Sequence, residues 1–393
     1  MRNNITVGID IGTHQIKVMV VEHTIENGRA VPKIIATGLS ESKGLRYGYI
    51  INTPDVTRCI QSAVSDASKK ANMPIDSAFV SVGGIGLSSA SSTGSTIISR
   101  ADTKITELDI ENVMQIAEDE LPTQHSINRK IINALPLQFK LDGKIVLGNP
   151  LDLKGGKLEV KALFITILEN HFNDVVQTVI NAGIDVIDVK ASPIASSIVL
   201  LSKTQKIAGC VLVNIGAETV SLVVYENSIP ISLEVFPIGS TDITNDIALG
   251  LKISLDDAES FKTNTKSSSA SRRKLEEIIL ARLSDIFELI EGHLRKINRN
   301  ALLPAGIIIS GGGSAITSIE DFARTALRLP SQLGKVQFIG EDSSGVISDS
   351  TWSVVYGLCI LGYYDNTASN SNLKQITNKF IRSATLWVKQ FLP

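Results

Sequence analysis

The N-terminal part of the chain alternates between apolar runs and polar turns, in an order that predicts strand, turn, strand, strand and helix. The expected strands are Ile5–Ile11, Ile16–Glu22 and Ile34–Leu39. Apolar side chains then recur at helical spacing from Pro54 to Ala71, and Thr53 is placed to cap this helix. This opening is typical of an α/β domain.

From residue 85 to residue 167 the pattern changes. An amphipathic helix is expected over Glu107–Leu121, and apolar strands are expected over Lys130–Phe139 and Leu158–Ile167. The segment therefore predicts a compact α+β insert within the surrounding α/β fold.

The opening strand, turn and strand recur later in the chain. A helix is expected over His171–Ala182, after which the apolar strand Cys210–Asn214, a turn at Ile215–Gly216 and the strand Thr219–Tyr225 follow. Two similar halves, each with a hairpin and a small-residue turn, predict a duplicated α/β domain with a cleft between the copies.

Helical patterns in the second half flank the polar stretch Lys262–Ser271, which we expect to be a loop. The helix from Arg273 onward carries one apolar face and one charged face, so it is expected to pack on the core. A buried strand over Ala305–Ser310 follows. The apolar run Val354–Leu361 is too short to span a membrane and predicts a core helix.

The C-terminal tail predicts a membrane-surface helix. Residues 363–375 are polar and are expected to form a linker, and residues 376–393 form an amphipathic pattern. The residues expected to contact the membrane are Ile376, Phe380, Ile381, Trp387, Val388, Phe391 and Leu392, with the basic residues Lys379, Arg382 and Lys389. No acidic residue follows Asp365, which favours binding to anionic lipid. The alternative is a terminal helix packed on the protein's own core.

Composition narrows the class of protein. The 38 basic and 40 acidic residues give a net charge of -2, so the chain as a whole lacks the positive charge that attracts nucleic acid. The three cysteines are far apart and are expected to be buried and reduced, and the five histidines lack metal-binding spacing. The N-terminus lacks the apolar run of a secretory signal. These features predict a folded cytoplasmic protein.

The first hairpin carries a candidate phosphate-binding turn. Asp10, Gly12 and Thr13 place a carboxylate, a glycine and a hydroxyl between two apolar strands, and His14 and Lys17 follow as further candidate nucleotide contacts. Such a turn can direct N–H groups at phosphate oxygens, while Asp10 faces Mg²⁺ through water. Taken alone, the same residues are also typical of an ordinary hairpin turn.

Two further loops strengthen the nucleotide hypothesis. The equivalent turn of the second half and the loop after the buried strand at Ser310 supply small or polar residues suited to close approach by phosphate, ribose and purine. These candidates are Asn214, Gly216, Ala217, Glu218 and Thr219, and then Gly311, Gly312, Gly313 and Ser314. Glu259 and Lys262 share a helix face and are candidates for the adenosine side, although a solvated ion pair would have the same spacing.

These residues carry a resemblance to the actin-like ATPase superfamily, and within it the chain resembles the FtsA family of bacterial cell-division proteins. The resemblance runs from Ile5 to about Gly362. Its motifs include Val7–Thr13, Gly183–Val186, Ile243–Ala248 and Leu303–Gly313. It implies an actin-like (ribonuclease H-like) fold of class α/β, with duplicated α/β domains, a nucleotide cleft and an α+β insert subdomain.

The resemblance also implies a domain plan. Residues 1–84 would form the first actin-like half (subdomain 1A) and residues 85–167 the insert (1C). Residues 168–362 would complete 1A and form the second half, with its outer subdomain 2B at about 243–303.

The implied function is to bind ATP with Mg²⁺, polymerise, and tether the FtsZ ring to the cytoplasmic face of the inner membrane at the division septum. The implied partners are the C-terminal tail of FtsZ, further copies of this chain, anionic lipids and other division proteins, with no nucleic acid.

The chain departs from the superfamily pattern at the second phosphate loop. That loop usually has the pattern Asp-x-Gly-Gly-Gly-Thr, whereas this chain has Asn214 for the aspartate and Ala217–Glu218 for two glycines. The segment Ala191–Ala195, where hydrolytic relatives carry an acid, offers none. We therefore expect nucleotide binding with weak or absent hydrolysis.

Two other functions share this fold. A type IV pilus assembly protein resembling PilM has a similar opening loop and insert but no amphipathic tail. A small-molecule kinase of the sugar-kinase type requires a carboxylate base and a substrate pocket in the cleft.

Overall fold

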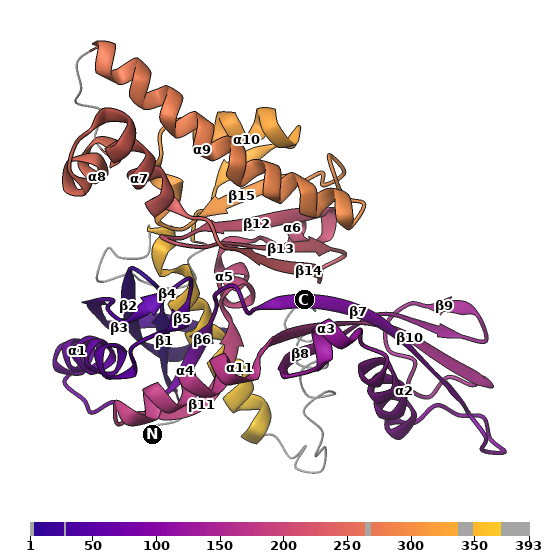
Figure 1. Ribbon diagram of the computed structural model, residues 1–393. Coiled ribbons are helices and arrows are strands. Elements are labelled where there is room, and N and C mark those ends of the chain that lie inside the picture. Colours follow the sequence, from indigo (N-terminus) through magenta and orange to yellow (C-terminus); the bar gives the residue numbers. More distant parts are fainter. Residues whose placement is uncertain (1–3, 27–28, 264–268, 337–348, 371–393) are drawn as a thin grey trace. The chain divides into compact units, whose positions relative to one another are not determined.

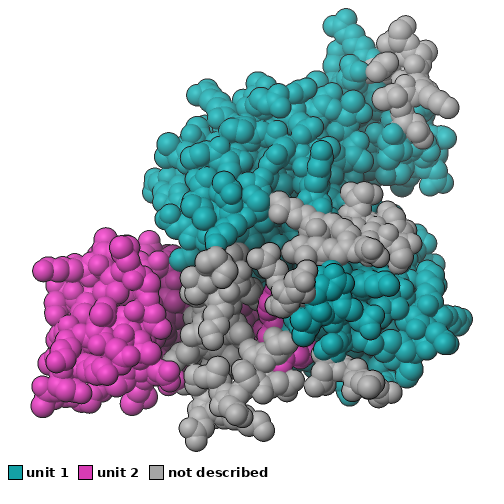
Figure 2. All heavy atoms as spheres, turned by 180° about the vertical axis from the view of Figure 1, so that it is seen from behind, with its two compact units in different colours: residues 1–86, 174–363 teal, residues 87–173, 364–393 magenta. Residues whose placement is uncertain are grey.

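The computed structural model describes residues 4–26, 29–263, 269–336 and 349–370 (Figure 1). The chain divides into two compact units, coloured in Figure 2. Unit 1 consists of residues 1–86 and 174–363, and unit 2 of residues 87–173 and 364–393. The candidate nucleotide residues all belong to unit 1.

Unit 1 contains two five-stranded sheets. The strands of the first are β1 (Ile5–Ile11), β2 (Gln15–Glu26), β3 (Arg29–Glu41), β6 (Ser77–Val82) and β11 (Asp185–Ala191). Their order across the sheet is β11-β6-β1-β2-β3, with β1 antiparallel to β2 and parallel to β6. The helix α1 (Thr53–Ala71) packs on β2 and β3. A short hairpin of β4 (Leu45–Arg46) and β5 (Tyr49–Ile50) precedes α1.

The second sheet repeats the first. Its strands are β12 (Cys210–Ile215), β13 (Val220–Glu226), β14 (Ile229–Phe236), β15 (Ile307–Ser310) and β16 (Ser331–Leu333). The order β14-β13-β12-β15-β16 and the strand directions match those of the first sheet. The predicted duplication of the α/β domain is therefore confirmed.

Helices cover both sheets of unit 1. They are α4 (Glu169–Asn181, shared with unit 2), α5 (Ser192–Leu200), α6 (Lys203–Ala208), α7 (Ser240–Leu251), α8 (Leu255–Thr263), α9 (Ser269–Lys296), α10 (Ile319–Leu327) and α11 (Ser353–Asn370), with 3-10 turns at Gly312–Ala315 and Ser350–Trp352. The apolar face of α9 is buried in one core with α7, α10 and the second sheet. Leu358 of α11 and Ala195 of α5 bury Phe79 of β6 in a separate cluster. A Cβ on Gly8 would lie 2.8 Å from the carbonyl oxygen of Val355, so β1 and α11 pack closely.

Unit 2 is an antiparallel sheet with one main helix against it. The strand order is β7 (Ser88–Ile97), β10 (Lys157–Leu168), β8 (Arg129–Leu141) and β9 (Lys144–Val146), and the helices are α2 (Glu107–Asp119) and α3 (Thr123–Ser126). A Cβ on Gly94 would lie 2.2 Å from the carbonyl oxygen of Val113, so α2 lies directly on β7.

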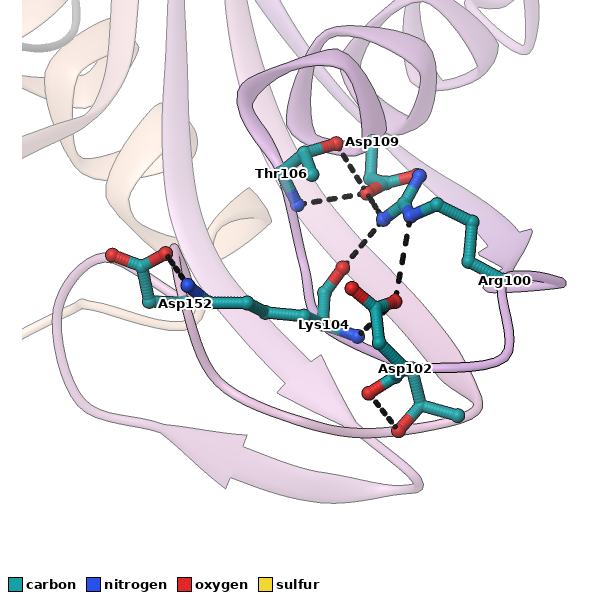
Figure 3. A network of polar contacts seen from close by, with 7 residues as sticks. Arg100, Asp102, Lys104, Thr106, Asp109 and Asp152 are labelled. Atoms are coloured by element: carbon teal, nitrogen blue, oxygen red, sulfur yellow. Dashed lines mark hydrogen bonds and ion pairs between the residues drawn. The ribbon is translucent and has the colours of Figure 1, made fainter.

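A polar network joins the start of α2 to the preceding loop (Figure 3). The Asp109 carboxylate accepts hydrogen bonds from the Arg100 guanidinium at 2.5 Å and from the Thr106 amide at 2.8 Å. The bond from Arg100, more than any other contact, lowers the pKa of Asp109 to about 2. The network therefore fixes the loop that leads into the helix.

Several expected boundaries are corrected. The cap of α1 is Asn52, whose side chain accepts from the Asp55 amide, and not Thr53, which already belongs to the helix. The helix α11 continues to Asn370, so the linker predicted from residue 363 is wrong over its first residues. Once the buried face of α11 has formed its first turns, each further residue adds one hydrogen bond at low entropic cost, and this outweighs the polar composition.

Two expectations about side chains and membranes can be compared with the structure. Cys59, Cys210 and Cys359 are free and buried, as predicted. Among the described residues, no helix combines the length and apolar character needed to span a bilayer. The amphipathic helix predicted over residues 376–393 lies outside the described residues.

Candidate functional site

A cavity of about 560 Å³ lies within unit 1 and is lined by loops from both sheets. It meets the β1–β2 turn, the β12–β13 turn, the loop after β15, and residues of α7 and α8. Most of the nucleotide-binding residues predicted from the sequence line this cleft. They are Asp10, Gly12, Thr13, His14, Lys17, Asn214, Gly216, Ala217, Thr219, Glu259, Lys262, Gly311 and Gly312.

The first turn is held by short-range backbone contacts. The Gly12 amide donates to the carbonyl oxygen of Gln15 at 3.2 Å, and a Cβ on Gly12 would come within 2.9 Å of the same oxygen. The Asp10 carboxylate accepts from the Ser81 hydroxyl at 2.6 Å. Burial raises the pKa of Asp10, although the Ser81 bond and the nearby Lys17 charge oppose that rise. The turn thus carries a carboxylate fixed by a neighbouring strand.

Lys17 lies opposite Asp10 across the β1–β2 ladder. Its Nζ donates to the carbonyl oxygen of Thr351 at 2.8 Å and lies 5.4 Å from the centroid of the Trp352 ring. Burial lowers the pKa of Lys17, and the carboxylates of Asp10 and Asp349 partly restore it. A buried cation therefore stands at the wall of the cleft.

The second turn has the same geometry as the first. The Gly216 amide donates to the carbonyl oxygen of Thr219 at 2.9 Å, and the Thr241 amide donates to the carbonyl oxygen of Ala217 at 2.8 Å. A Cβ on Gly239 would lie 2.2 Å from that Ala217 oxygen, so only glycine lets α7 begin so close to the turn. The turn is thereby fixed to the N-terminus of α7.

Glu218 was also predicted to bind nucleotide, but its side chain is directed elsewhere. It does not line the cleft, and its carboxylate accepts the amide of Tyr47 at 2.5 Å instead. It lines a smaller neighbouring cavity of about 170 Å³. The Glu218 carboxylate is thus directed toward a donor outside the cleft, which avoids the repulsion that a carboxylate next to phosphate would meet.

Glycines determine the backbone conformation of the third loop, which follows β15. Gly311 has φ +86, and a Cβ there would lie 2.3 Å from Oδ1 of Asn214. A Cβ on Gly313 would lie 2.4 Å from the Ile215 side chain, whereas a Cβ on Gly312 would meet no atom within 4 Å. Gly313 and Ser314 lie outside the lining of the cleft, so their role as nucleotide contacts stays a prediction. They shape the loop, because both pack or bond within it.

Glu259 and Lys262 form an ion pair at 2.7 Å on α8. The Lys262 side chain is only 7% exposed, and its Nζ also donates to the Thr244 hydroxyl at 2.9 Å. Burial alone would raise the pKa of Glu259, but the hydrogen bonds from Lys262 and Thr244 outweigh it and lower the pKa. The Lys262 side chain of this pair is therefore buried, the Glu259 side chain is 54% exposed, and both residues line the cleft.

Sequence reasoning missed several polar residues at the site. Ser81 holds Asp10, Thr244 bridges Glu259 and Lys262, and Ser192 lines the cleft. The only available signal was that Ser81 occurs near the end of a strand that precedes glycines, which is also common elsewhere. Ser192 stands in the segment Ala191–Ala195, and its hydroxyl donates to the carbonyl oxygen of Val82 at 2.9 Å.

The donor set fits a nucleotide with a hydrated cation. Ligand pockets usually enclose roughly 300–1,000 Å³, and this cleft falls within that range. Lys17 supplies a cation, and three glycine-containing loops supply backbone N–H groups, for phosphate. Among the described residues there is no group of three or more His, Cys, Asp or Glu side chains that could hold a metal ion. Asp10 suits Mg²⁺ bound through water and phosphate, which is its usual mode.

Two family models match the chain. The model "Cell division protein FtsA" matches residues 211–357, and the model "SHS2 domain inserted in FTSA" matches residues 84–166. Together they cover more than half of the chain.

Curated relatives cover most of the chain. The cell division protein FtsA of Pseudomonas aeruginosa is 27% identical over an alignment of 379 residues that covers 91% of this chain and 88% of that protein. The cell division protein FtsA of Bacillus subtilis is 28% identical over an alignment of 361 residues that covers 86% of this chain and 80% of that protein.

Solved structures share the fold. A chain of the PilM–PilN type IV pilus biogenesis complex is similar with a TM-score of 0.68 and 16% identity, covering 91% of this chain and 98% of that one. MreB5 of Spiroplasma citri bound to ADP is similar with a TM-score of 0.52 and 12% identity, covering 94% of this chain and 99% of that one. At these identities the likeness establishes the actin-like fold alone.

Proposed function

The chain belongs to the FtsA family of cell-division proteins, and we propose that it binds ATP in the cleft of unit 1, polymerises, and tethers FtsZ to the cytoplasmic membrane. The observation that carries the nucleotide part is the convergence of the β1–β2 turn, the β12–β13 turn and the loop after β15 on one cavity. The fold of the ADP-bound and AMPPNP-bound MreB5 structures, which hold nucleotide, gives further support.

Within this proposal the residues of the cleft have separate roles. The glycine turns present N–H groups to phosphate, Lys17 balances phosphate charge, and Asp10 orients the water shell of Mg²⁺. We assign Glu259 and Lys262, which reach the cleft from α8, to the adenosine side. Bound ATP with Mg²⁺ would supply the phosphate and metal charges with which these side chains and backbone N–H groups interact.

Slow or absent hydrolysis is part of the proposal. Asn214 lines the cleft at the position where the superfamily usually has aspartate, and an amide does not take a proton from water. Ser192 lines the cleft from the segment in which hydrolytic relatives carry an acid, and its hydroxyl donates to a backbone carbonyl. ATP would therefore act mainly by setting the conformation of a protomer.

Attachment to the membrane is assigned to the tail. Residues 376–393 carry an apolar face and a basic face, and each cation near an anionic surface contributes about 1 kcal/mol. Ordering the helix costs roughly 1–2 kcal/mol per residue, so a single protomer is expected to bind weakly. A filament that presents many tails gains avidity without any new contact. Polymerisation would in this way recruit the protein, and FtsZ with it, to the membrane at the division site.

Sedimentation with anionic vesicles tests this function. Full-length protein with ATP should pellet with the vesicles and carry purified FtsZ with it. The Trp387→Glu variant and a truncation before Ile376 should leave both proteins in the supernatant, while still binding ATP. Equal pelleting of FtsZ in all three samples would refute the tether.

A further inference from the structure

The contact between Glu218 and Tyr47 joins the two halves of unit 1. Tyr47 lies in the β4–β5 hairpin of the first half, and Glu218 lies in the β12–β13 turn of the second half. The Tyr47 amide donates to Oε2 of Glu218 at 2.5 Å, although the two residues are 171 positions apart. A charged acceptor makes this the stronger class of hydrogen bond.

The donor is held rigidly in its own half. Tyr47 and Gly48 have φ +49 and +85, which is the two-residue hairpin turn with both central residues left-handed. The Tyr47 carbonyl oxygen accepts from the Ile85 amide at 3.2 Å, and a Cβ on Gly48 would lie 2.4 Å from Cα of Gly84. The amide is therefore presented at the tip of a hairpin that packs against a glycine pair.

The acceptor is held in the other half by the contacts described for the second turn. The backbone that leads into Glu218 is fixed to the start of α7, because Thr241 bonds to Ala217 and Gly239 permits the close approach. The carboxylate is thus projected from a fixed backbone. Arg46, beside Tyr47, adds a positive charge to the same small cavity.

The bond lies directly beside the nucleotide cleft. Gly48 follows Tyr47 and Ala217 precedes Glu218, and both of these neighbours line the cleft. Thr241 and Asn245 line the cleft and also the smaller cavity that contains Glu218 and Tyr47. The hydrogen bond therefore ties one wall of the cleft to the other.

We propose that Glu218 is a positioning residue that clasps the two halves over bound nucleotide and slows its release. This rests on the proposed nucleotide function of the cleft. Nucleotide leaves when the walls separate, and separation breaks the bond between the Tyr47 amide and the Glu218 carboxylate. The chain has thus put a carboxylate where the superfamily usually has glycine, and has directed it at the opposite wall.

Nucleotide release measures the effect of the bond. Dissociation of a fluorescent ATP analogue, chased with excess ATP, should be about tenfold faster for Glu218→Ala than for the wild type, since a bond to a charged acceptor is lost. Glu218→Gln keeps a neutral acceptor and should be intermediate, at about threefold. Glu320→Ala is the matched control, because Glu320 accepts one backbone amide, that of Leu333 at 2.9 Å, within the second half. Its dissociation rate should stay within about twofold of the wild type.

Amide hydrogen exchange of peptides spanning the β4–β5 hairpin tests the bond without nucleotide. Exchange at Tyr47 should be faster in Glu218→Ala than in the wild type, and unchanged in Glu320→Ala. An unchanged exchange rate at Tyr47, an unchanged dissociation rate in Glu218→Ala, or an equal rise in Glu320→Ala would each overturn the clasp. If the wild type binds no nucleotide, the proposed function fails by itself, and the exchange measurement still decides whether the bond forms.

Discussion

Gly312 offers a way to block the cleft without disturbing the fold. A Cβ at this position meets no atom within 4 Å, and its backbone is outside the left-handed region that disfavours side chains. Gly312 lines the cleft, so a longer side chain takes up space within it. The substitution Gly312→Arg is therefore expected to leave the fold intact and to exclude nucleotide.

The size of the effect follows from the contacts that a nucleotide would lose. One hydrogen bond to a charged group contributes about 1.5–3 kcal/mol, and losing two costs at least about 3 kcal/mol, which is more than about 100-fold in Kd. Gly312→Ala is the matched control, because it adds only a methyl group in open space. Its free energy of unfolding should change by less than about 0.5 kcal/mol, and its affinity should remain near that of the wild type.

Titration calorimetry with ATP and Mg²⁺ measures the affinity, and thermal unfolding without nucleotide verifies the fold. Gly312→Leu, which carries no charge, should lose binding as Gly312→Arg does, because bulk is the cause. If folded Gly312→Arg protein binds ATP as tightly as the wild type, the nucleotide has been assigned to the wrong place.

Three further predictions concern Gly311, Asn214 and the buried His23. Gly311→Ala should lower the free energy of unfolding in urea by about 2–4 kcal/mol, because φ +86 is unfavourable for alanine and the added Cβ would meet Asn214. An unchanged midpoint of urea unfolding would contradict this backbone strain. Asn214→Asp should leave ATP turnover slow in a phosphate-release assay, because Ser192 supplies no second acid; turnover of several per second in either protein would be inconsistent with this. Burial lowers the pKa of His23 to about 4 from 6.5, so between these values the unfolded state binds more protons and stability falls as the pH drops. His23→Gln should flatten that slope in denaturant titrations, and identical slopes would exclude the buried histidine as a cause.

The fold was predictable because its elements are marked locally. The strands at Ile5–Ile11 and Cys210–Ile215 are apolar runs that end in small-residue turns, and their repetition predicted the duplicated sheets. The loop at Gly311 was predictable for the same reason, since a glycine run after a buried strand has few other uses. The local pattern and the duplication together predicted that most of the cleft residues lie at one site.

Boundaries were less predictable, because neighbouring residues compete for the same role. Asn52 and Thr53 are both good caps, and the extended backbone of Asn52, with φ -142, decides between them. The end of α11 is similar: a polar composition indicated a linker, whereas helix propagation carries the backbone to Asn370.

Contacts between distant segments were not predictable from the sequence. Ser81 reaches Asp10 across 71 positions, and Glu218 reaches Tyr47 across 171. Nothing in the local pattern distinguishes these side chains from ordinary surface serines and glutamates. Their partners depend on how the strands are ordered in the sheet and on how the two halves of unit 1 meet.

Electron microscopy of the purified protein on an anionic lipid monolayer tests the central claim most directly. With ATP and Mg²⁺ the full-length protein should form filaments on the lipid. The Gly312→Arg variant, which cannot hold nucleotide, and a truncation before Ile376, which lacks the tail, should leave the monolayer bare. Filaments of equal density with Gly312→Arg, or a bare monolayer with the wild type, would contradict an ATP-dependent, membrane-bound polymer.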